Sequence, residues 1–411
     1  MENELIQSRD IIMLGIQPWD VEIGCNFKNM AIELSSQYRV IYVNKPLDRI
    51  TTIIHRSDLK TINRLASIKK GKGVLEEVQR NLYVFNPQVM LESINWMPPG
   101  RLFVFFNKRN NRKLADQISL AYKKLGFENP LLLIDNDFNN GLYLKEYLKL
   151  RDEIYYLRDY LLSQPYFFKH GVRSEPMILK KSDIVLTNSR YLENYAKKYN
   201  SNTFYIGQGC EVEEFTKRTE VFPEDIASIQ KPVIGYCGAL MSLRLDIDLL
   251  FSIAIERPNW NIVLVGPEDA DFKKSKLHKL PNIYFLGPKE PSKLPAYIHY
   301  FDVCINPQVV NQMTIGNYPR KVDEYLAAGK AVVATATEAM EEFIDITYLC
   351  RDLPEYLSAI EEALKTADDA IWVKKRMQVA RSHTWRNSIM KLYSAVNQTL
   401  NVKQDAGRRN G

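Results

Sequence analysis

Short apolar runs alternate with amphipathic stretches along most of this chain. Strands are predicted at residues 11–16, 39–44, 82–87, 131–135, 153–159, 183–188 and 203–208, and again at 232–240, 261–266, 282–287, 303–306, 331–335 and 348–350. Buried parallel strands read as short continuous apolar runs, and the helices that cover them show a period near 3.6. The pattern therefore predicts parallel sheets covered by helices, an α/β fold.

Helices fit between these runs. They are expected near residues 26–36, 112–125, 141–150, 176–181 and 189–199, then near 246–256, 293–300, 320–328 and 354–366, with a long charged helical pattern from 370 to 402. The second half starts afresh at Pro232, after a polar and acidic linker at 207–231. We expect two Rossmann-like doubly wound domains that face one another across a cleft, at residues 1–215 and 216–385. Residues 386–411 would form a C-terminal helix whose last segment, NVKQDAGRRNG, is disordered.

The composition is that of a soluble globular protein, with 45% hydrophobic and 25% charged residues in 411. No apolar run approaches the roughly 18 residues that span a bilayer, and the polar N-terminus is unlike a signal peptide. Five scattered cysteines without C-x-x-C spacing indicate reduced thiols and no metal framework. These features predict a cytoplasmic protein.

The net charge of +6 is unevenly placed. Residues 1–200 hold 30 Lys and Arg against 22 Asp and Glu, a net +8, whereas residues 201–411 hold 25 against 27. Between Thr51 and Lys123, 13 basic residues face 5 acidic ones. Such a patch suits an anionic membrane face or an anionic acceptor, although a merely solvated face is an alternative. We find no nucleic-acid recognition motif and expect no nucleic-acid partner.

Candidate chemistry concentrates between residues 306 and 335, NPQVVNQMTIGNYPRKVDEYLAAGKAVVAT. An apolar strand leads through a polar loop into a helix, and Gly329 ends that helix before the next strand. Ligands of open α/β sheets bind where strand ends meet helix starts. Lys321 at the helix start suits a phosphate, and Glu324 one turn later suits ribose hydroxyls. The segment predicts a nucleotide-sugar site, with an ordinary capped surface helix as the alternative.

Several motifs follow one another in a familiar order. They are VIGYCGAL, NIVLVGP, NIYFLGPKEPSKLPAYIHYFDVCINP, YPRKVDEYLAAGKAVVAT and SHTWRNSIMKL in the second half, with IIMLGIQPWD and YYLRDY in the first. Together they resemble the retaining glycosyltransferases of family four, which have the GT-B fold, and within them bacterial transferases of the teichuronic-acid or exopolysaccharide type. The resemblance is strong from Pro232 to Thr335 and loose from Pro46 to Pro130.

The resemblance implies roles for particular residues. Glu324 would hydrogen-bond the donor ribose, because a carboxylate can accept from two vicinal hydroxyls. Arg244 and Lys321 would stabilise the charge of the departing diphosphate, so that no metal is expected. Donor contacts are further expected from Gly15, Gly238, Gly287, Thr314 and Asn317. The family's second glutamate, eight residues before Glu324, is replaced here by Gly316, and its contact with the donor sugar would fall to Thr314, Asn317 or backbone N–H groups.

In the first half, Gly15 and Gly24 would let the loop after the first strand approach the substrates closely, with Asp20 as an acidic group in the same loop. Asp159, at the end of YYLRD, would orient the acceptor hydroxyl or take its proton. A strand-end or capping aspartate is the alternative for Asp159.

The resemblance and the residues together predict an enzyme, a retaining glycosyltransferase. It would move a sugar from a nucleoside-diphosphate sugar to a glycan or lipid-linked acceptor in bacterial surface polysaccharide synthesis. It would work in the cytoplasm, with peripheral contact at the inner face of the cell membrane. The alternatives are a nucleotide-sugar epimerase of GT-B fold and a non-catalytic GT-B relative that acts as a binding subunit.

Overall fold

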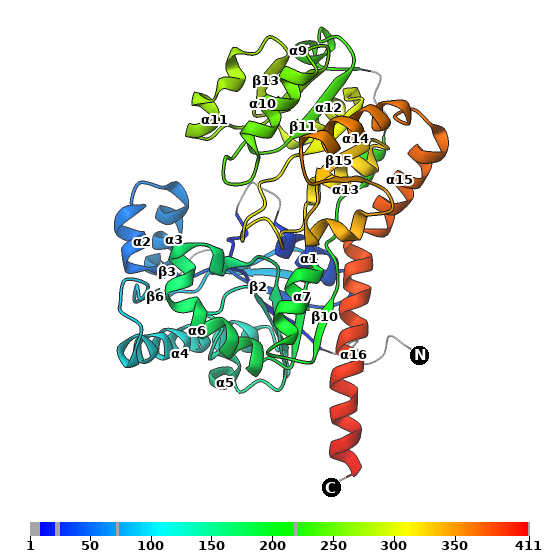
Figure 1. Ribbon diagram of the computed structural model, residues 1–411. Coiled ribbons are helices and arrows are strands. Elements are labelled where there is room, and N and C mark those ends of the chain that lie inside the picture. Colours follow the sequence, from blue (N-terminus) through cyan, green and yellow to red (C-terminus); the bar gives the residue numbers. More distant parts are fainter. Residues whose placement is uncertain (1–8, 21–24, 71–73, 218–220, 410–411) are drawn as a thin grey trace. The chain divides into compact units, whose positions relative to one another are not determined.

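The computed structural model describes residues 9–20, 25–70, 74–217 and 221–409. These residues divide into two compact units (Figure 1). Unit 1 comprises residues 1–207 together with 388–411, and unit 2 comprises residues 208–387. The chain thus returns to unit 1 for its last helix, and the expected linker at 207–231 begins unit 2.

Unit 1 contains two sheets. Its strands are β1 (Ile11–Leu14), β2 (Val40–Val43), β3 (Leu47–Asp48), β4 (Leu75–Gln79), β5 (Leu82–Phe85), β6 (Met90–Leu91), β7 (Leu131–Asp135), β8 (Glu153–Leu157), β9 (Ile184–Thr187) and β10 (Thr203–Tyr205). Its helices are α1 (Asn26–Ser35), α2 (Arg49–Ile54), α3 (Leu59–Lys70), α4 (Arg101–Lys124), α5 (Leu144–Leu148), η1 (Leu161–Ser163), α6 (Pro165–Lys181), α7 (Arg190–Lys197) and α16 (Trp385–Arg409).

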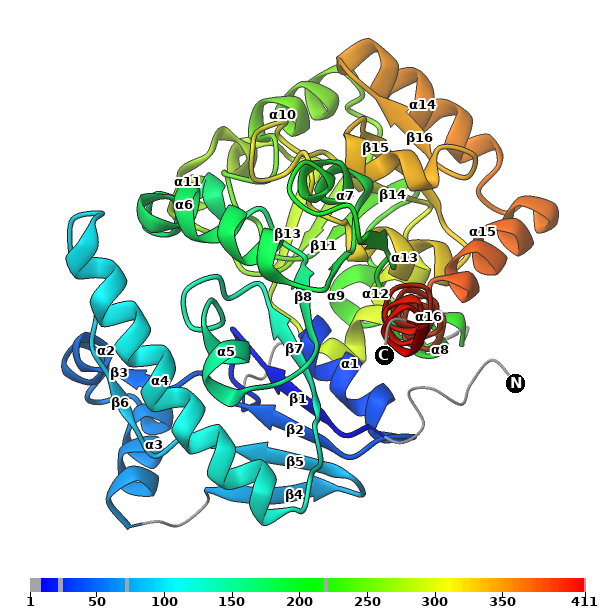
Figure 2. The same cartoon turned by 90° about the horizontal axis from the view of Figure 1, so that it is seen from below.

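The main sheet of unit 1 has the strand order β10-β9-β8-β7-β1-β2-β5-β4. Figure 2 shows β1, β2, β5 and β4 side by side in that order. Seven of these strands are parallel, and only β4 pairs antiparallel with its neighbour. Every apolar run predicted as a strand in this half is confirmed. The sequence pattern missed β4 because its residues, LEEVQ, are charged and largely exposed, which is typical of an edge strand.

Helices cover both faces of this sheet. Alternate strand residues such as Ile12 and Ile41 share a buried cluster with residues of α4 to α7. Tyr42, on the opposite face of β2, contacts Phe27 of α1. In Figure 1, α1 lies above the strands and α4 and α5 lie below them. This arrangement is the doubly wound fold that the alternation of strands and helices predicted.

Two helices of unit 1 are longer than expected. The prediction began α4 at residue 112 and α6 at residue 176, whereas they begin at Arg101 and Pro165. Their first turns, RLFVFF and PYFFKH, are too rich in aromatic residues to show a clear helical period. Pro176 lies inside α6 rather than at its start, and the carbonyl that it leaves unpaired belongs to the exposed Val172 and can bond water.

The long helical pattern near the C-terminus is two helices rather than one. The chain leaves helical geometry at His383 and Thr384, and the Thr384 hydroxyl accepts a hydrogen bond from the Asn387 N–H (3.3 Å) at the start of α16. The helix α16 is drawn to Arg409, and disorder of the last segment stays a prediction. Its last residues include helix formers such as Lys, Gln, Ala and Arg, and they extend a helix already begun.

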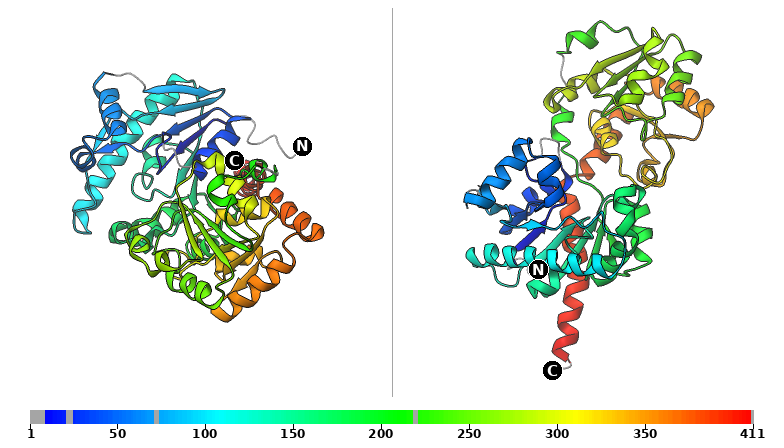
Figure 3. Two further views of the ribbon diagram at one scale, coloured as in Figure 1. Left: turned by 90° about the horizontal axis from the view of Figure 1, so that it is seen from above. Right: turned by 90° about the vertical axis from the view of Figure 1, so that its left-hand side faces the viewer.

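Unit 2 contains a single sheet of six parallel strands. They are β11 (Val233–Cys237), β12 (Asn261–Val265), β13 (Ile283–Gly287), β14 (Val303–Asn306), β15 (Ala331–Thr335) and β16 (Tyr348–Cys350). The helices are α8 (Glu213–Thr216), α9 (Glu224–Ala227), α10 (Ile247–Glu256), α11 (Ala270–Lys274), η2 (Lys276–Lys279), η3 (Pro291–Lys293), α12 (Leu294–Tyr300), α13 (Arg320–Ala327), η4 (Glu338–Phe343), α14 (Leu353–Lys365) and α15 (Ala370–Ser382). The left panel of Figure 3 shows strands of this sheet, coloured from green to orange, among their helices.

Each face of this sheet carries its own core. One buried cluster joins the strands to α12, α13 and α15, and the other joins them to α10 and α14. Each core is an uninterrupted apolar layer, so the carboxyl edge of the strands is the natural place for polar side chains to gather.

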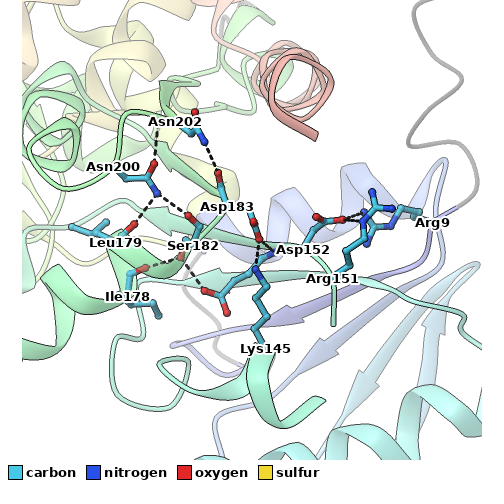
Figure 4. A network of polar contacts seen from close by, with 11 residues as sticks. Arg9, Lys145, Arg151, Asp152, Ile178, Leu179, Ser182, Asp183, Asn200 and Asn202 are labelled. Atoms are coloured by element: carbon cyan, nitrogen blue, oxygen red, sulfur yellow. Dashed lines mark hydrogen bonds and ion pairs between the residues drawn. The ribbon is translucent and has the colours of Figure 1, made fainter. Parts of the chain in front are cut away.

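A network of polar contacts braces the amino edge of the unit 1 sheet (Figure 4). The Asp183 carboxylate accepts from Lys145 Nζ (2.5 Å) and from the Glu153 N–H (2.9 Å), and Ser182 Oγ donates to Glu153 Oε1 (2.9 Å). Burial raises the pKa of Glu153 to about 7, although Ser182 and Lys145 oppose the rise. The network lies at the starts of β8 and β9, opposite the strand ends that carry the candidate chemistry, and we assign it a structural role.

Candidate functional site

The strand order of unit 2 singles out one place on its carboxyl edge. From β11 the chain passes to β12 and β13 on one side and then crosses to β14, β15 and β16 on the other. Loops that leave β11 and β14 therefore diverge, and in open α/β sheets ligands bind at this reversal. Gly238 follows β11 and Pro307 follows β14. The donor residues expected in this half of the chain lie on these loops, at the end of β13, and on α13.

Lys321, in the first turn of α13, lies beside the end of β11. A Cβ atom built on Gly238 would be only 3.1 Å from Lys321 Nζ, and Gly238 has a positive φ of 145°, which favours glycine. The ammonium group donates to the Tyr236 hydroxyl and lies 4.3 Å from the centre of that ring. Within the described residues, it has no carboxylate partner in an ion pair. Its charge is thus held in place and stays available to an anion.

Arg244 lies on the loop after β11, and that loop is fastened to the loop after β14. The Val309 N–H donates to the Arg244 carbonyl (3.0 Å), and the Asp246 N–H donates to the Pro307 carbonyl (2.9 Å). Asn311 Nδ2 donates to the Leu243 carbonyl (2.9 Å). The Arg244 side chain is exposed, and in the part of the chain that the structure describes it has no ion-pair partner. Arg244, the second predicted cation, therefore lies on a loop at the carboxyl edge of the sheet, with a free guanidinium group.

The loop before α13 is organised around Asn311. Asn311 Oδ1 accepts from the N–H groups of Met313 (2.8 Å) and Thr314 (3.1 Å). The buried Thr314 hydroxyl accepts from the Asn311 N–H (3.0 Å) and donates to the Val309 carbonyl. This hydroxyl is buried and used within the loop, which it braces, and the contact of Thr314 with the donor stays a prediction.

Asn317 is the other candidate of this loop. Its side chain is half-buried, and no hydrogen bond of its carboxamide is found among the described residues. Gly316, which stands where the family has a glutamate, is buried in the same loop. Of the replacements considered for that glutamate, Asn317 is the side chain whose polar atoms remain available.

Glu324 lies one turn after Lys321 on α13, so the two side chains lie on one side of the helix. Its carboxylate is 3.2 Å from Arg320 Nε, and its side chain is 15% exposed. That pair lacks hydrogen-bond geometry, since Arg320 Nε has no hydrogen-bond partner. Burial raises the pKa of Glu324, and the charges of Arg320 and Lys321 oppose the rise. A carboxylate with unused acceptor capacity suits vicinal hydroxyls.

Sequence reasoning missed the partner of the neighbouring residue, Asp323. This fully buried carboxylate is 2.7 Å from His383 Nδ1 and accepts from the Tyr318 hydroxyl (2.9 Å). Burial raises its pKa, and the hydrogen bond with His383 opposes the rise. Sixty positions separate Asp323 and His383, so no local spacing could reveal the pair. The pair fastens the start of α13 to the end of α15 and so holds in place the helix that carries Lys321 and Glu324.

Gly287 ends β13 with a positive φ of 69°, and its carbonyl accepts from the Gly266 N–H (3.0 Å). Gly266 in turn passes so close to Gly238 that a Cβ on Gly266 would lie 1.9 Å from the Gly238 carbonyl oxygen. The ends of β11, β12 and β13 are thus tied together through glycines.

Unit 1 has a corresponding reversal, between β1 and β7. Gly15 follows β1, and a Cβ there would lie 2.3 Å from the Tyr42 hydroxyl, so a side chain at this position would collide with it. The Tyr42 hydroxyl donates to the Gln17 carbonyl (2.8 Å) and so supports the loop that follows. Asp20 pairs with Arg64 (2.7 Å). Gly24 lies outside the described residues.

Asp159 follows β8 and belongs to an ion-pair cluster that the sequence did not reveal. Arg158 Nη1 contacts Asp159 Oδ2 (2.8 Å), and Arg158 Nε contacts Asp135 Oδ1 (2.6 Å) at the end of β7. Burial raises the pKa of Asp135, and Arg158 opposes the rise. Asp159 is the accessible member, with 36% of its side chain exposed, whereas Asp135 is fully buried. The cluster holds the Asp159 carboxylate at the carboxyl edge of the sheet, where it can meet a substrate.

Within the described residues, no three His, Cys, Asp or Glu side chains form a group that could hold a metal ion. The same residues include no helix long and apolar enough to cross a membrane. The five cysteines are buried as free thiols.

Comparison with known proteins agrees with this geometry. Residues 231–366 match the family model of the group 1 glycosyl transferases. This segment runs from the start of β11 through α14 and includes every donor residue predicted in unit 2.

One curated relative is provisionally named as the teichuronic acid biosynthesis glycosyltransferase TuaH of Bacillus subtilis strain 168. It is 27% identical over 240 residues, which cover 56% of this chain and 60% of the length of TuaH.

Similar solved structures extend over nearly the whole chain. Anabaena Alr3699/HepE, solved in complex with UDP, has a TM-score of 0.65 at 15% identity and covers 95% of this chain and 100% of its own. The apo structure of OtsA has a TM-score of 0.66 at 12% identity over 94% of this chain and 99% of its own. An Escherichia coli protein described as trehalose-6-phosphate bound with UDP-2-fluoro glucose has a TM-score of 0.64 at 12% identity, with coverage of 94% and 98%. At these identities the likeness shows the fold, GT-B.

Proposed function

We propose that this protein is a retaining glycosyltransferase that uses a nucleoside-diphosphate sugar in bacterial surface polysaccharide synthesis. The observation that carries the proposal is the placement of Lys321 and Glu324. Both lie on α13 at the strand-order reversal of unit 2, with the ammonium group against the glycine that ends β11. A cation and a carboxylate one turn apart match the diphosphate and the ribose of one nucleotide.

The roles follow from the charges. Lys321 and Arg244 bind the diphosphate and stabilise the negative charge that grows on it as the glycosidic bond breaks. Glu324 accepts hydrogen bonds from the ribose hydroxyls. Asn317 contacts the donor sugar, in place of the glutamate that the family has at the position of Gly316. Because these two cations balance the charge of the diphosphate, we propose that the reaction needs no metal ion or other cofactor.

In the proposed reaction, the acceptor oxygen bonds to the anomeric carbon on the face from which the diphosphate departs. The bond between that carbon and the phosphate oxygen breaks, and its electron pair leaves with the nucleoside diphosphate. The acceptor proton passes to the departing phosphate, and Asp159 orients the acceptor hydroxyl. Atoms and charge balance without any further reactant, and the anomeric configuration is kept.

We choose uridine nucleotides as the first donors to test, because two of the structures similar in fold hold UDP or a UDP sugar. A thermal-shift screen of UDP, GDP, ADP and CMP sugars in EDTA is expected to show stabilisation by one base class. Ligand at 100 times its Kd stabilises a protein by about 2.7 kcal/mol. The donor proposal is wrong if no nucleotide shifts the midpoint, and a shift that requires added Mg²⁺ contradicts the metal-free site.

The acceptor is proposed to be a glycan or a lipid-linked glycan reached at the inner face of the cell membrane. Besides its excess of basic residues, unit 1 exposes apolar side chains on α2 and α3, among them Ile53, Ile54 and Leu59. Apolar and basic groups on adjacent short helices are typical of a surface that meets anionic lipid.

Membrane contact predicts a salt-dependent association. The protein is expected to co-sediment with vesicles that contain phosphatidylglycerol at about 50 mM salt and to be released at about 500 mM, because salt screens the attraction. Replacing the exposed Arg56 and Lys69 by glutamine is expected to reduce the bound fraction several-fold. Equal sedimentation with neutral phosphatidylcholine vesicles at both salt concentrations would refute the electrostatic contact.

A further inference from the structure

A cavity of about 410 Å³ lies in unit 1 between the first turns of α4 and the middle of α6. Phe103 of α4 stacks on His170 of α6, with ring centres 3.7 Å apart and planes within 4°. Figure 1 shows the two helices next to one another. The residues that line the cavity are Pro99, Gly100, Arg101, Phe103, Val104, Asn107, Leu142, Tyr143, His170, Arg173, Ser174 and Met177. Most of this lining is apolar or aromatic, and its size lies in the range of small-molecule sites, about 300–1,000 Å³.

The charged lining residues of this cavity are cations. Arg101 and Arg173 are both exposed, and neither has an ion-pair partner in the described ranges of the chain. No Asp or Glu is among the lining residues. Val104 and Met177, which are about two-fifths exposed, complete the opening with apolar surface. An apolar chamber with two free guanidinium groups is complementary to a hydrocarbon chain that carries an anionic head.

Burial also explains why the cavity stays apolar at neutral pH. His170 Nε2 donates to the Asn95 carbonyl (3.3 Å), and burial lowers the pKa of His170. Burial therefore favours the neutral ring, which stacks on Phe103 in the wall of the chamber.

A second cavity, of about 680 Å³, lies in unit 1 and is lined by residues from Leu91 to Trp96 and from Pro165 to Lys169, together with residues of β3, α2 and the loop after β7. Asn95, Trp96, Tyr166 and Lys169 line it, and the two segments are joined by hydrogen bonds from Asn95 Nδ2 to the Tyr166 carbonyl (3.1 Å) and from Lys169 Nζ to the Trp96 carbonyl (2.9 Å). Its lining differs in character, because it includes Lys45, Asp48, Glu92, Asp137 and several Asn side chains. The segments 94–100 and 165–170 thus run from this more polar cavity to the apolar one.

We propose that the smaller cavity binds one hydrocarbon chain of a phosphate-headed lipid, with Arg101 and Arg173 at the phosphate. The larger polar cavity then receives the glycan that such a lipid carries. Identifying this lipid as the acceptor rests on the proposed function, whereas binding of the chain itself does not. The acceptor class is then a single-chain lipid phosphate, which the basic surface alone does not specify.

The test uses dodecyl phosphate below its micelle concentration, with binding measured by calorimetry on the full chain. Val104→Trp fills the opening and is expected to weaken binding at least tenfold. Val172→Trp is the matched control, because Val172 lies on α6 with the same 40% exposure but does not line the cavity. The control is expected to bind like the wild type, and inorganic phosphate alone is expected to bind far more weakly than dodecyl phosphate.

The head-group assignment has its own variant. Arg101→Gln with Arg173→Gln is expected to weaken dodecyl phosphate binding about tenfold and to flatten its dependence on salt. The lipid site would be overturned if Val104→Trp and Val172→Trp bound dodecyl phosphate with equal affinity. It would also be overturned if inorganic phosphate bound as tightly as dodecyl phosphate. The thermal shift by UDP is measured on the same variants and is expected to be unchanged. If the wild type does not bind UDP, the donor proposal is refuted instead. Failure of the lipid site and failure of the proposed function are therefore distinguishable.

Discussion

Replacing Lys321 by methionine is expected to lower kcat about 100- to 1000-fold, the usual effect of removing one group that stabilises transition-state charge. Methionine keeps much of the volume of the stem but carries no charge. Lys321 makes no ion pair with the described carboxylates, so the folded state loses only its contacts with Tyr236. The effect should therefore appear in turnover of a nucleotide sugar far more than in the melting temperature.

The control for Lys321→Met is Lys365→Met on α14, where 72% of the lysine side chain is exposed. It removes the same charge from unit 2 at a distance in the sequence from the loops of the site. We expect its kcat to match the wild type. If Lys321→Met retains kcat within threefold, the diphosphate is bound elsewhere and the role of α13 is refuted.

Replacing Glu324 by glutamine is expected to weaken UDP binding about 10- to 100-fold, because hydrogen bonds to a charged group contribute about 1.5–3 kcal/mol. The sharper readout compares UDP with 2′-deoxy-UDP. The wild type should prefer UDP, since the deoxynucleotide offers the carboxylate one hydroxyl fewer. Glu324→Gln should bind both nucleotides with similar affinity, and Glu362→Gln, at an exposed site on α14, should behave like the wild type.

The same variant carries a pH dependence with a defined sign. Burial raises the pKa of Glu324, so the carboxyl is neutral over a wider acidic range than an exposed glutamate. Ribose binding by the ionised form is complete above that raised pKa and weakens as the pH falls through it. The preference for UDP over 2′-deoxy-UDP should shrink on acidification in the wild type and stay flat in Glu324→Gln. A wild-type preference that is constant down to pH 4.5 would contradict the ribose assignment.

The fold could be read from the sequence because its signals are local. Runs such as IIML and VIYV are continuous apolar strands, and Gly329 marks the end of α13. The failures have physical reasons. The charged edge strand β4 buries little, and the first turns of α4 and α6 are aromatic on several faces. The division of the chain was also hidden, because α16 packs with unit 1 through pairs such as Tyr38 and Tyr393, which are 355 positions apart.

Part of the candidate site could also be predicted from the sequence, because some of its residues are close together along the chain. Lys321 and Glu324 share one helix, so their spacing alone places them together. Arg244 depended on the resemblance, and the structure shows how backbone hydrogen bonds fasten its loop to the loop after β14. Thr314 is predicted from the sequence to contact the donor, and the structure shows that its hydroxyl bonds within the loop.

By itself, the sequence determined the α/β class, the parallel strands, and the helix that presents a cation and a carboxylate, because these depend on residues a few positions apart. Only the tertiary structure decided which distant groups meet. It paired Asp323 with His383, set Arg158 between Asp135 and Asp159, and opened an apolar chamber between α4 and α6. Such contacts are made when strands and helices pack, and the energy of packing depends on side chains that no local pattern connects.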